Sequence, residues 1–296
     1  SRKRAAVAAG PWIRPSGIIV PGVNKALSEK QQSNTEVIAT VEQTPGAYGP
    51  LCWGAQTHVG KVRTENQDAF FADAHVGLFV VSDGMGGHRG GALASGIVAD
   101  DLPVMIENAL EKLKVGAPRT IRTLLKRAIA EQNRQLHLEG TSESGFKDMG
   151  ATIVIALFRK DRCFVANVGD SRAYRLRAGR FAQLTRDHSV VSELIEQGRI
   201  EPEEAPDHPA SGQLTHYIGM EEKARPHVLS FGLRKNDRIL LCTDGLTDMV
   251  SDEEIAAVLK ADADPNAACS ELVTAANKAG GHDNVTTLIV DWNRSP

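Results

Sequence analysis

The amino-acid sequence predicts an α+β fold in which antiparallel β-sheets carry helices on their outer faces. The first observation is the number of short apolar or alternating segments, ten in all, most of them bounded by turn-forming residues, as strands are. The second is their order: two long helical patterns follow one another between groups of strands, whereas a parallel sheet would alternate strand and helix regularly. Helices packed outside antiparallel sheets are consistent with both observations.

The predicted strands begin after a proline-rich and polar stretch, residues 1–50, which we interpret as a flexible N-terminal tail in which one segment could dock. The globular domain is predicted over residues 51–293. Its strands are expected at 53–58, 69–73, 77–83, 151–158, 163–169, 173–179, 180–185, 227–232, 238–244 and 286–292.

Five helices are expected, at 91–113, 118–139, 189–198, 252–261 and 265–279. The last three begin at residues that commonly cap helices. Ser189 precedes the third helix, and Ser251 forms a capping box with Glu254 at the start of the fourth. Asp264 precedes the fifth, which has Pro265 at its first position.

The composition excludes several classes of protein. A formal charge of −3, with acidic and basic residues interspersed, provides no basic surface for nucleic acid. Four cysteines without a CxxC pair favour neither a zinc site nor a disulfide framework, which fits a reducing compartment. No apolar run reaches the ~18 residues of a membrane helix, and no apolar leader precedes the domain. We therefore expect a cytoplasmic protein that does not bind membranes.

Aspartate residues follow three of the predicted strands. Asp83, Asp170 and Asp244 each come at or just after a strand end and are followed at once by Gly or Ser. Two more, Asp68 and Asp283, lie in loops shortly before strands. Because strand ends hold side chains firmly while leaving their tips in loop-lined clefts, we expect these carboxylates to converge.

A cluster of carboxylates repels itself, so it either takes up protons or binds a hard cation. Oxygen ligands without Cys or paired His favour Mg²⁺ or Mn²⁺ over Zn²⁺. The glycines after Asp83 would also let the backbone carbonyl of Gly84 reach an ion. Two such ions about 3.5 to 4 Å apart can share a bridging water, lower its pKa and direct it at phosphorus. The sequence therefore predicts a phosphohydrolase site.

Simpler interpretations exist for each residue alone. An Asp-Gly pair at a strand end is most often a hairpin turn, an interpretation that three such aspartates together weaken. The glycine-rich run after Asp83 also suggests a dinucleotide-binding loop. However, Gly84, Gly86 and Arg89 break the GxGxxG spacing, and the acid precedes the glycines. We therefore set the dinucleotide interpretation aside.

Seven ordered motifs carry a resemblance to a known family: RTENQDAF, VVSDGMGGHRGG, MGATIVIAL, ANVGDSRAYRLR, LTRDHS, LLCTDGLTDMV and GGHDNVTTLIV. Over residues 56–291 the chain resembles the metal-dependent Ser/Thr protein phosphatases of the PPM, or type 2C, class in their bacterial form. The resemblance implies a four-layer αββα sandwich, two antiparallel sheets flanked by helices, with a binuclear Mn²⁺ or Mg²⁺ site at one end.

The resemblance also implies a role for each candidate site residue. Asp83 would bridge the two ions, and Gly84 would give its carbonyl to one of them. Asp244 and Asp283 would complete the other. Asp68 would hold the second ion, largely through water.

Three further residues complete the implied site. Asp170, together with Asp244, matches the pair that holds a third, weaker ion in bacterial members. Arg63 matches the arginine that binds the substrate phosphate, a role that suits the guanidinium fork. Asn284 would orient Asp283 or the waters of the site.

The sequence departs from the family pattern at two positions. Met85 stands where eukaryotic members carry a histidine proposed as general acid, so that role is empty here. His188 is one candidate replacement, and a metal-held water is the other. Gln67 stands where many relatives have Glu.

Residues 189–217 correspond to the flap beside the active site of bacterial relatives, and their proline content and acidity suit a lid.

The expected function is hydrolysis of phosphoserine and phosphothreonine on proteins, by direct attack of a water held between two ions. The expected partners are phosphoproteins made by a bacterial Ser/Thr kinase, and the expected assembly is a monomer. The alternative is a non-catalytic phosphoprotein-binding or scaffold module on the same fold. The complete set of acids together with Arg63 argues against that alternative.

Overall fold

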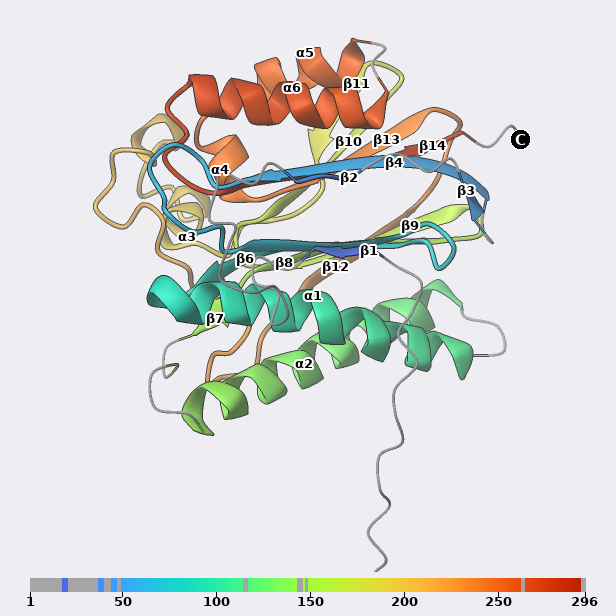
Figure 1. Cartoon of the computed structure of the whole chain (residues 1–296), viewed down its shortest axis with the longest axis horizontal. Helices are drawn as coiled ribbons and strands as arrows, with labels where there is room; N and C mark the ends of the chain where they lie inside the picture. The colour runs from blue at the N-terminus through green and yellow to red at the C-terminus, as the bar shows by residue number, and fades with distance from the viewer. Residues whose placement is uncertain are drawn as a thin grey trace, which may run out of the picture.

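Two seven-stranded antiparallel sheets lie face to face, and helices cover both outer faces (Figure 1). The computed structural model describes residues 18–20, 37–39, 44–46, 49–113, 117–142, 146, 149–261 and 264–293. The α+β class and the four-layer αββα arrangement expected from the sequence are therefore confirmed.

Each sheet joins strands that are distant in the sequence. The first contains, in spatial order, β1 (Ile18–Val20), β5 (Asp68–Asp73), β6 (Leu78–Met85), β8 (Ile153–Arg159), β9 (Arg162–Val168) and β12 (His227–Gly232), with β7 (Gly150–Ala151) paired to β6. The second contains β11 (Arg180–Gln183), β10 (Arg172–Arg177), β13 (Asp237–Cys242), β14 (Val285–Trp292), β4 (Gly49–His58) and β2 (Val37–Ala39), with β3 (Thr44–Gly46) paired to β4.

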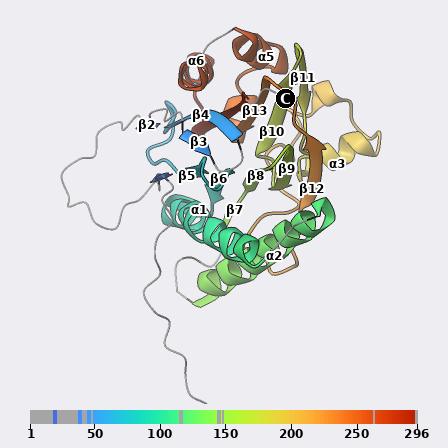
Figure 2. The ribbon, with the colours of Figure 1, turned by 90° about the vertical axis from the view of Figure 1, so that its right-hand side faces the viewer.

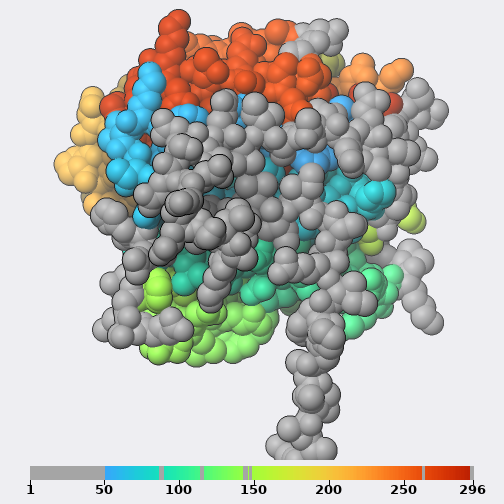
Figure 3. Space-filling view, viewed as in Figure 1, coloured from blue at the N-terminus to red at the C-terminus, as the bar shows by residue number. Residues whose placement is uncertain are grey.

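The helices form the two outer layers. α1 (Gly87–Glu111) and α2 (Pro118–Ser142) cover the first sheet, and α5 (Asp252–Lys260) and α6 (Pro265–Lys278) cover the second (Figure 2). In the space-filling view these pairs form the green lower and red upper surfaces (Figure 3). Three short helices, α3 (Val190–Glu196), η1 (Pro202–Glu204) and α4 (Asp244–Thr247), lie in connections between strands.

Strands β5 and β6 are buried on both faces, which explains their nearly uninterrupted apolar sequences. Successive side chains point to opposite faces of a strand. Phe71 and Val80 accordingly join the core beneath α1 and α2, whereas Phe70 and Phe79 join the core between the sheets. There Phe79 meets Phe158 edge to face, with 5.7 Å between ring centroids. The two cores fix the register of the strands that lead into the site.

All ten expected strands and all five expected helices are present, with shifted ends. The three expected caps are confirmed. The side chain of Ser189 accepts a hydrogen bond from the backbone of Ser192, Ser251 and Glu254 form the capping box, and Asp264 caps α6. The sequence did not predict β1, β2, β3, β7, α4 or η1, and it placed the start of α1 four residues too late.

The expected flexible tail, residues 1–50, lies mostly outside the described residues. Three short segments of it are described, and their backbones pair with the domain. β1 pairs with β5, while β2 and β3 both pair with β4. In the described part of the chain, no helix has the length and apolar character needed to cross a bilayer.

Two carboxylates lie near each other under α1, one of them, Asp73, at the opposite end of β5 from Asp68. Oε1 of Glu107 and Oδ2 of Asp73 are buried, and neither has a hydrogen-bond partner. Burial, followed by the charges of Asp73 and Glu111, raises the pKa of Glu107 to about 7. Because the folded state binds this proton more tightly, its stabilising contribution is complete below the unfolded pKa of about 4.5 and is lost as the pH rises through about 7.

We therefore expect Glu107→Gln, which imitates the protonated acid, to raise the free energy of unfolding at pH 8 by about 1 kcal/mol, allowing for solvent screening of this partly buried side chain. At pH 5 the variant and the wild type should differ little. Urea denaturation in EDTA at both pH values measures the effect, and Glu221→Gln, at an exposed position that does not influence Glu107, is the control. An equal change at both pH values would contradict the assignment.

Candidate active site

A cavity of about 450 Å³ opens at the end of the sandwich where β6 leads into α1. It collects residues from both sheets and from the loops between them. Its lining comprises Arg63, Thr64, Glu65, Gln67, Asp83, Gly84, Met85, Gly86, Thr152, Asp170, Gly212, Leu214, Asp244, Asp283 and Asn284. Seven of the nine residues expected in the site line this one cavity.

The strand ends bring the acids together as expected. Asp68 is the first residue of β5 and lies directly opposite Asp83 in β6. Asp244 begins α4 two residues after β13, and Asp283 lies two residues before β14. The cluster is therefore shared between the sheets. Asp170 reaches it from the β9–β10 loop.

The backbone around Asp83 is fixed by Thr152 on the neighbouring strand. The amide of Asp83 donates to Oγ1 of Thr152 at 3.0 Å, and the amide of Thr152 donates to the carbonyl of Asp83 at 2.8 Å. Oγ1 of Thr152 also lies 2.7 Å from Oγ of Ser171, the residue after Asp170. One threonine therefore holds two of the acid-bearing segments in register.

Mutual repulsion and burial disfavour ionisation of the acids. Burial first, and then the charges of Asp244, Asp68, Asp170 and Asp283, raise the pKa of Asp83 well above its usual range. The pKa of Asp244 is likewise well raised, and burial is again the largest cause. Burial also raises the pKa of both Asp68 and Asp170 to about 7. A bound cation would relieve this repulsion and restore the ionised forms.

Two buried carboxylate oxygens indicate where a cation would fit. Oδ2 of Asp68 accepts hydrogen bonds from Oγ1 of Thr243 at 3.0 Å and from Oγ1 of Thr286 at 2.7 Å. Its Oδ1 is buried and has no hydrogen-bond partner, and the same is true of Oδ1 of Asp244. An acceptor left free in this way suits a hard cation such as Mg²⁺ or Mn²⁺. In the described residues, no three His, Cys, Asp or Glu side chains already stand in a metal-ligating arrangement.

Gly84 is held where no larger residue fits. A Cβ atom there would lie 2.0 Å from the carbonyl oxygen of Gly91 and 2.8 Å from that of Gln67. The amide of Gly84 donates to the same Gln67 carbonyl at 3.0 Å. The end of β6 at Gly84 therefore packs closely between Gly91 of α1 and the backbone of Gln67, just before β5.

Asn284 braces the loop that carries the arginine. Its side-chain amide donates to the carbonyls of Val59 and Glu65, both at 2.9 Å, and its oxygen accepts from the amide of Gln67 at 2.8 Å. Its backbone amide donates to Oδ1 of Asp283 at 2.8 Å. The backbone of Asn284 thus makes the expected contact with Asp283. The side chain of Asn284 fixes the loop at residues 59–67 through three hydrogen bonds.

Arg63 reaches over the cavity from this loop. One of its guanidinium nitrogens donates to Oδ2 of Asp283 at 2.7 Å. More than half of the arginine side chain is exposed, so this ion pair is a weak one.

His188 does not line the cavity. Its Nδ1 accepts from the amide of Gly169 at 3.2 Å, and its own amide donates to the Gly169 carbonyl at 3.0 Å. Its ring packs against His216 with 5.3 Å between centroids. Burial, with the charge of His216 next, lowers the pKa of His188 to about 4. A neutral, backbone-bonded imidazole is poorly suited to donate a proton at neutral pH.

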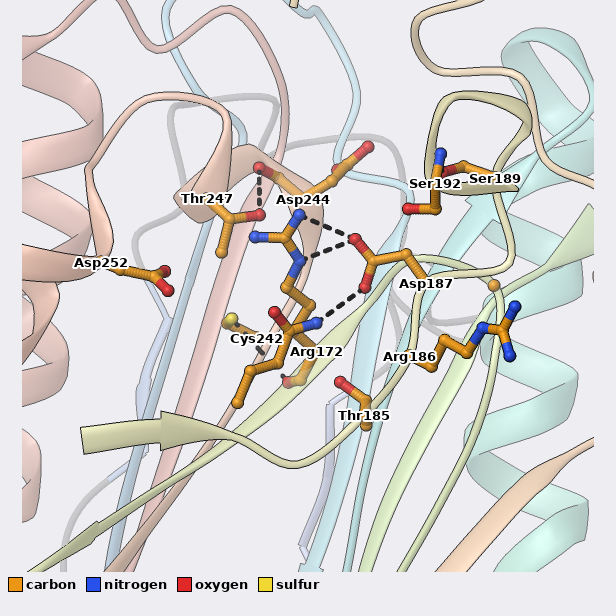
Figure 4. A network of polar contacts seen from close by, with 12 residues as sticks. Arg172, Thr185, Arg186, Asp187, Ser189, Ser192, Cys242, Asp244, Thr247 and Asp252 are labelled. Atoms are coloured by element: carbon orange, nitrogen blue, oxygen red, sulfur yellow. Dashed lines mark hydrogen bonds and ion pairs between the residues drawn. The ribbon is translucent and has the colours of Figure 1, made fainter. Parts of the chain in front are cut away.

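Several residues of the site were not expected from the sequence. Thr243 and Thr286, which fix Asp68, adjoin expected elements but carried no motif signal of their own. Asp248 follows Asp244 by one helical turn, a spacing that could have been noticed, and its charge raises the pKa of Asp170. The Arg172–Asp187 ion pair, near these acids, joins residues 15 positions apart (Figure 4).

A shared acidic cluster at one end of an αββα sandwich, with an arginine across the cavity, defines the class of metal-dependent phosphohydrolases. The chain belongs to the protein phosphatase 2C family, whose family model matches residues 56–280.

Relatives and solved structures agree with this placement. A serine/threonine phosphatase stp from Listeria welshimeri is 36% identical over 241 residues, covering 80% of this chain and 94% of the relative. The Mycobacterium tuberculosis serine/threonine phosphatase PstP/Ppp has a similar structure, with a TM-score of 0.70 and 32% identity over 82% of this chain and 99% of that one. A structure of the PstP catalytic domain with two manganese ions gives a TM-score of 0.70 and 30% identity, with the same coverage.

Proposed function

We propose that this chain hydrolyses phosphoserine and phosphothreonine on proteins by direct attack of water on phosphorus, without a phosphoenzyme. The observation that carries the proposal is the pair of buried, unpartnered carboxylate oxygens, on Asp68 and Asp244, within the aspartate cluster of the cavity. Two Mn²⁺ or Mg²⁺ ions bound there would lower the pKa of a water and neutralise the charge of the phosphate.

The acids divide between these ions according to the strands that carry them. Asp83 would contact both ions, and Gly84 would offer its carbonyl to one of them. Asp244 and Asp283, from segments of the second sheet, would complete the coordination of one ion. Asp68 would hold the other ion, largely through water. Thr243 and Thr286 support this role, because they fix one oxygen of Asp68 and leave the other free.

A third, weaker ion would be held by Asp170 and Asp244. Asp170 and Asp244 line the same cavity, and the charge of Asp170 is the largest electrostatic influence on Asp244, which supports a shared cation. The charge of Asp248 raises the pKa of both Asp170 and Asp244, so Asp248 adds to the negative potential around these two acids.

Arg63 would bind the substrate phosphate by exchanging its bond to Asp283 for one to a phosphate oxygen. Met85, in the cavity wall, offers no proton to the leaving serine or threonine oxygen. We infer that solvent in the cavity supplies this proton. The flap contributes Gly212 and Leu214 to the wall, so it is placed to contact the peptide around the phosphorylated residue.

A bacterial Ser/Thr kinase would supply the substrates, and we expect the chain to act as a monomer in the cytoplasm. The alternative function, a phosphoprotein-binding module without activity, is not favoured, because four of the five acids and Arg63 line one cavity and Asp68 lies opposite Asp83 in the strand register.

The deciding experiment is hydrolysis of p-nitrophenyl phosphate and of a phosphothreonine peptide with MnCl₂, with and without EDTA. We expect turnover that EDTA abolishes and added Mn²⁺ restores. If folded, Mn²⁺-loaded protein turned over neither substrate but still bound the phosphopeptide, the binding-module alternative would replace this proposal.

His188→Ala distinguishes a supporting histidine from a general acid. Because His188 contacts the Gly169 backbone and lies outside the cavity lining, we expect a loss of less than ~10-fold that is equal for both substrates. A general acid would matter far more for the phosphothreonine peptide, since p-nitrophenolate needs little protonation on leaving. The ratio of kcat values on the two substrates is the measurement, with His208→Ala in the flap as control. A selective loss on the peptide would restore His188 as the acid.

A further inference from the structure

A mostly buried ion pair joins Arg172 in β10 to Asp187. Nε of Arg172 donates a hydrogen bond to Oδ2 of Asp187 at 2.9 Å, and Nη2 lies 2.7 Å from the same oxygen in an ion pair (Figure 4). Only 28% of the Arg172 side chain and 8% of the Asp187 side chain are exposed. The other oxygen of Asp187 accepts from Nε2 of Gln183 at 3.0 Å. Both oxygens of Asp187 are therefore occupied, and it is positioned on two sides.

The rest of the guanidinium has one further partner. Nη1 of Arg172 donates to the hydroxyl of Tyr174 at 3.1 Å, and this hydroxyl donates to Asp252 at 3.0 Å. Tyr174 is neutral at ordinary pH, because burial raises its pKa far above the usual range. Asp187 is thus the one carboxylate that contacts Arg172 directly in the described structure.

Arg172 is also close to the acids of the cavity. It follows Asp170 by two residues, and in the strand register it lies opposite Cys242, two residues before Asp244. Among charged groups it has the largest influence on Asp248. The arginine therefore lies within electrostatic reach of carboxylates that a weakly bound cation would need.

We propose that Asp187 holds Arg172 away from Asp170 and Asp248, and so keeps the site of the third, weaker ion open to a divalent cation. The proposal rests on the proposed function, since it concerns that weaker ion. A buried guanidinium without its partner turns to the nearest carboxylate, because an unpaired buried charge is strongly unfavourable. Without Asp187, Arg172 would become an internal competitor for the ion. Asp187 and Arg172 are in this sense positioning residues that do not touch the substrate.

Neutralising Asp187 and neutralising Arg172 should change the Kd of the weakly bound ion in opposite directions. Asp187→Asn keeps the shape of the side chain but frees Arg172, so the Kd of the weakest Mn²⁺ should rise roughly tenfold, as expected for a unit charge moved within contact range. Arg172→Gln removes the competitor and should lower that Kd several-fold. The double variant should return close to the wild-type value.

Isothermal titration calorimetry with MnCl₂ measures the two tight ions and the weak ion on each variant, and thermal melting shows that each is folded. Gln183→Ala, which removes an uncharged hydrogen bond to Asp187 and leaves the ion pair in place, is the matched control and should change the weak Kd by less than ~2-fold. Loss of weak binding in all three pair variants would show a merely structural role and overturn the proposal. An unchanged Kd of the weakest Mn²⁺ in Asp187→Asn would also overturn the proposal. The absence of a third Mn²⁺ from the wild-type titration would overturn it too. Failure of the proposed function appears separately, as wild-type protein without tight Mn²⁺ binding or without turnover.

Discussion

Asp83→Asn should lower the turnover number for p-nitrophenyl phosphate by more than ~100-fold and should at the same time raise the melting temperature in EDTA. The loss exceeds the ~10–100-fold typical of outer-shell partners, because Asp83 is the one acid that would contact both tightly bound ions. It lies opposite Asp68 in the strand register and is influenced by every other acid of the cluster.

The gain in stability follows from the same crowding. The raised pKa of Asp83 means that its ionised form is disfavoured in the metal-free fold at neutral pH. Asparagine removes that repulsion while keeping the size of the side chain, so metal-free protein should become more stable. The rise in melting temperature that Mn²⁺ produces in the wild type should disappear.

Calorimetric melting with EDTA and with MnCl₂, together with steady-state kinetics, tests both halves of this prediction. Asp161→Asn, in the exposed turn between β8 and β9, is the control and should change neither quantity. Turnover within tenfold of wild type, or an unchanged response to Mn²⁺, would remove Asp83 from the centre of the site.

Gly84→Ala should lower the free energy of unfolding by about 2–3 kcal/mol and reduce turnover by more than ~10-fold. The added methyl group meets backbone atoms, the carbonyl oxygens of Gly91 and Gln67, which cannot rotate away. The end of β6 must therefore separate from the first turns of α1, and the carbonyl of Gly84 would move relative to Asp83.

Gly96→Ala provides the matched control on the same helix. A Cβ atom at Gly96 has open space around it, and alanine is the better helix former, so this variant should gain up to about 1 kcal/mol and keep full activity. Urea denaturation and kinetics of the two variants measure the contrast. Equal behaviour of the two alanines would show that the close packing at Gly84 has no functional importance.

The sequence predicted the fold well because its signals were local and agreed with one another. The apolar runs of β6 and β8, and caps such as Ser251 and Asp264, act within a few residues. The errors came where tertiary contacts decide. The glycine-rich run after Asp83 appeared to be a loop, but from Gly87 onward it belongs to α1. The two residues of β7 form a strand only through pairing with β6.

The candidate site was predictable to the extent that motifs mark it. The acids and Arg63 were found because they stand at strand ends in recognisable stretches. The support for them was not, since Thr243, Thr286 and Asp187 act through contacts between segments distant in the sequence. His188 illustrates the converse: its motif was visible, but only the structure shows its bond to the backbone of Gly169.

The division of the acids between the sheets has a consequence for how the protein's stability depends on its surroundings. Asp68 and Asp83 belong to the first sheet, and Asp244 and Asp283 to segments of the second. Ions held by both halves would cross-link the sandwich, and their binding energy would add to its folding energy. At a free cation concentration 100 times the Kd, this linkage adds about 2.7 kcal/mol per site. The lifetime of the fold in a cell would then follow the supply of manganese or magnesium, so that metal starvation would remove the protein itself as well as its activity.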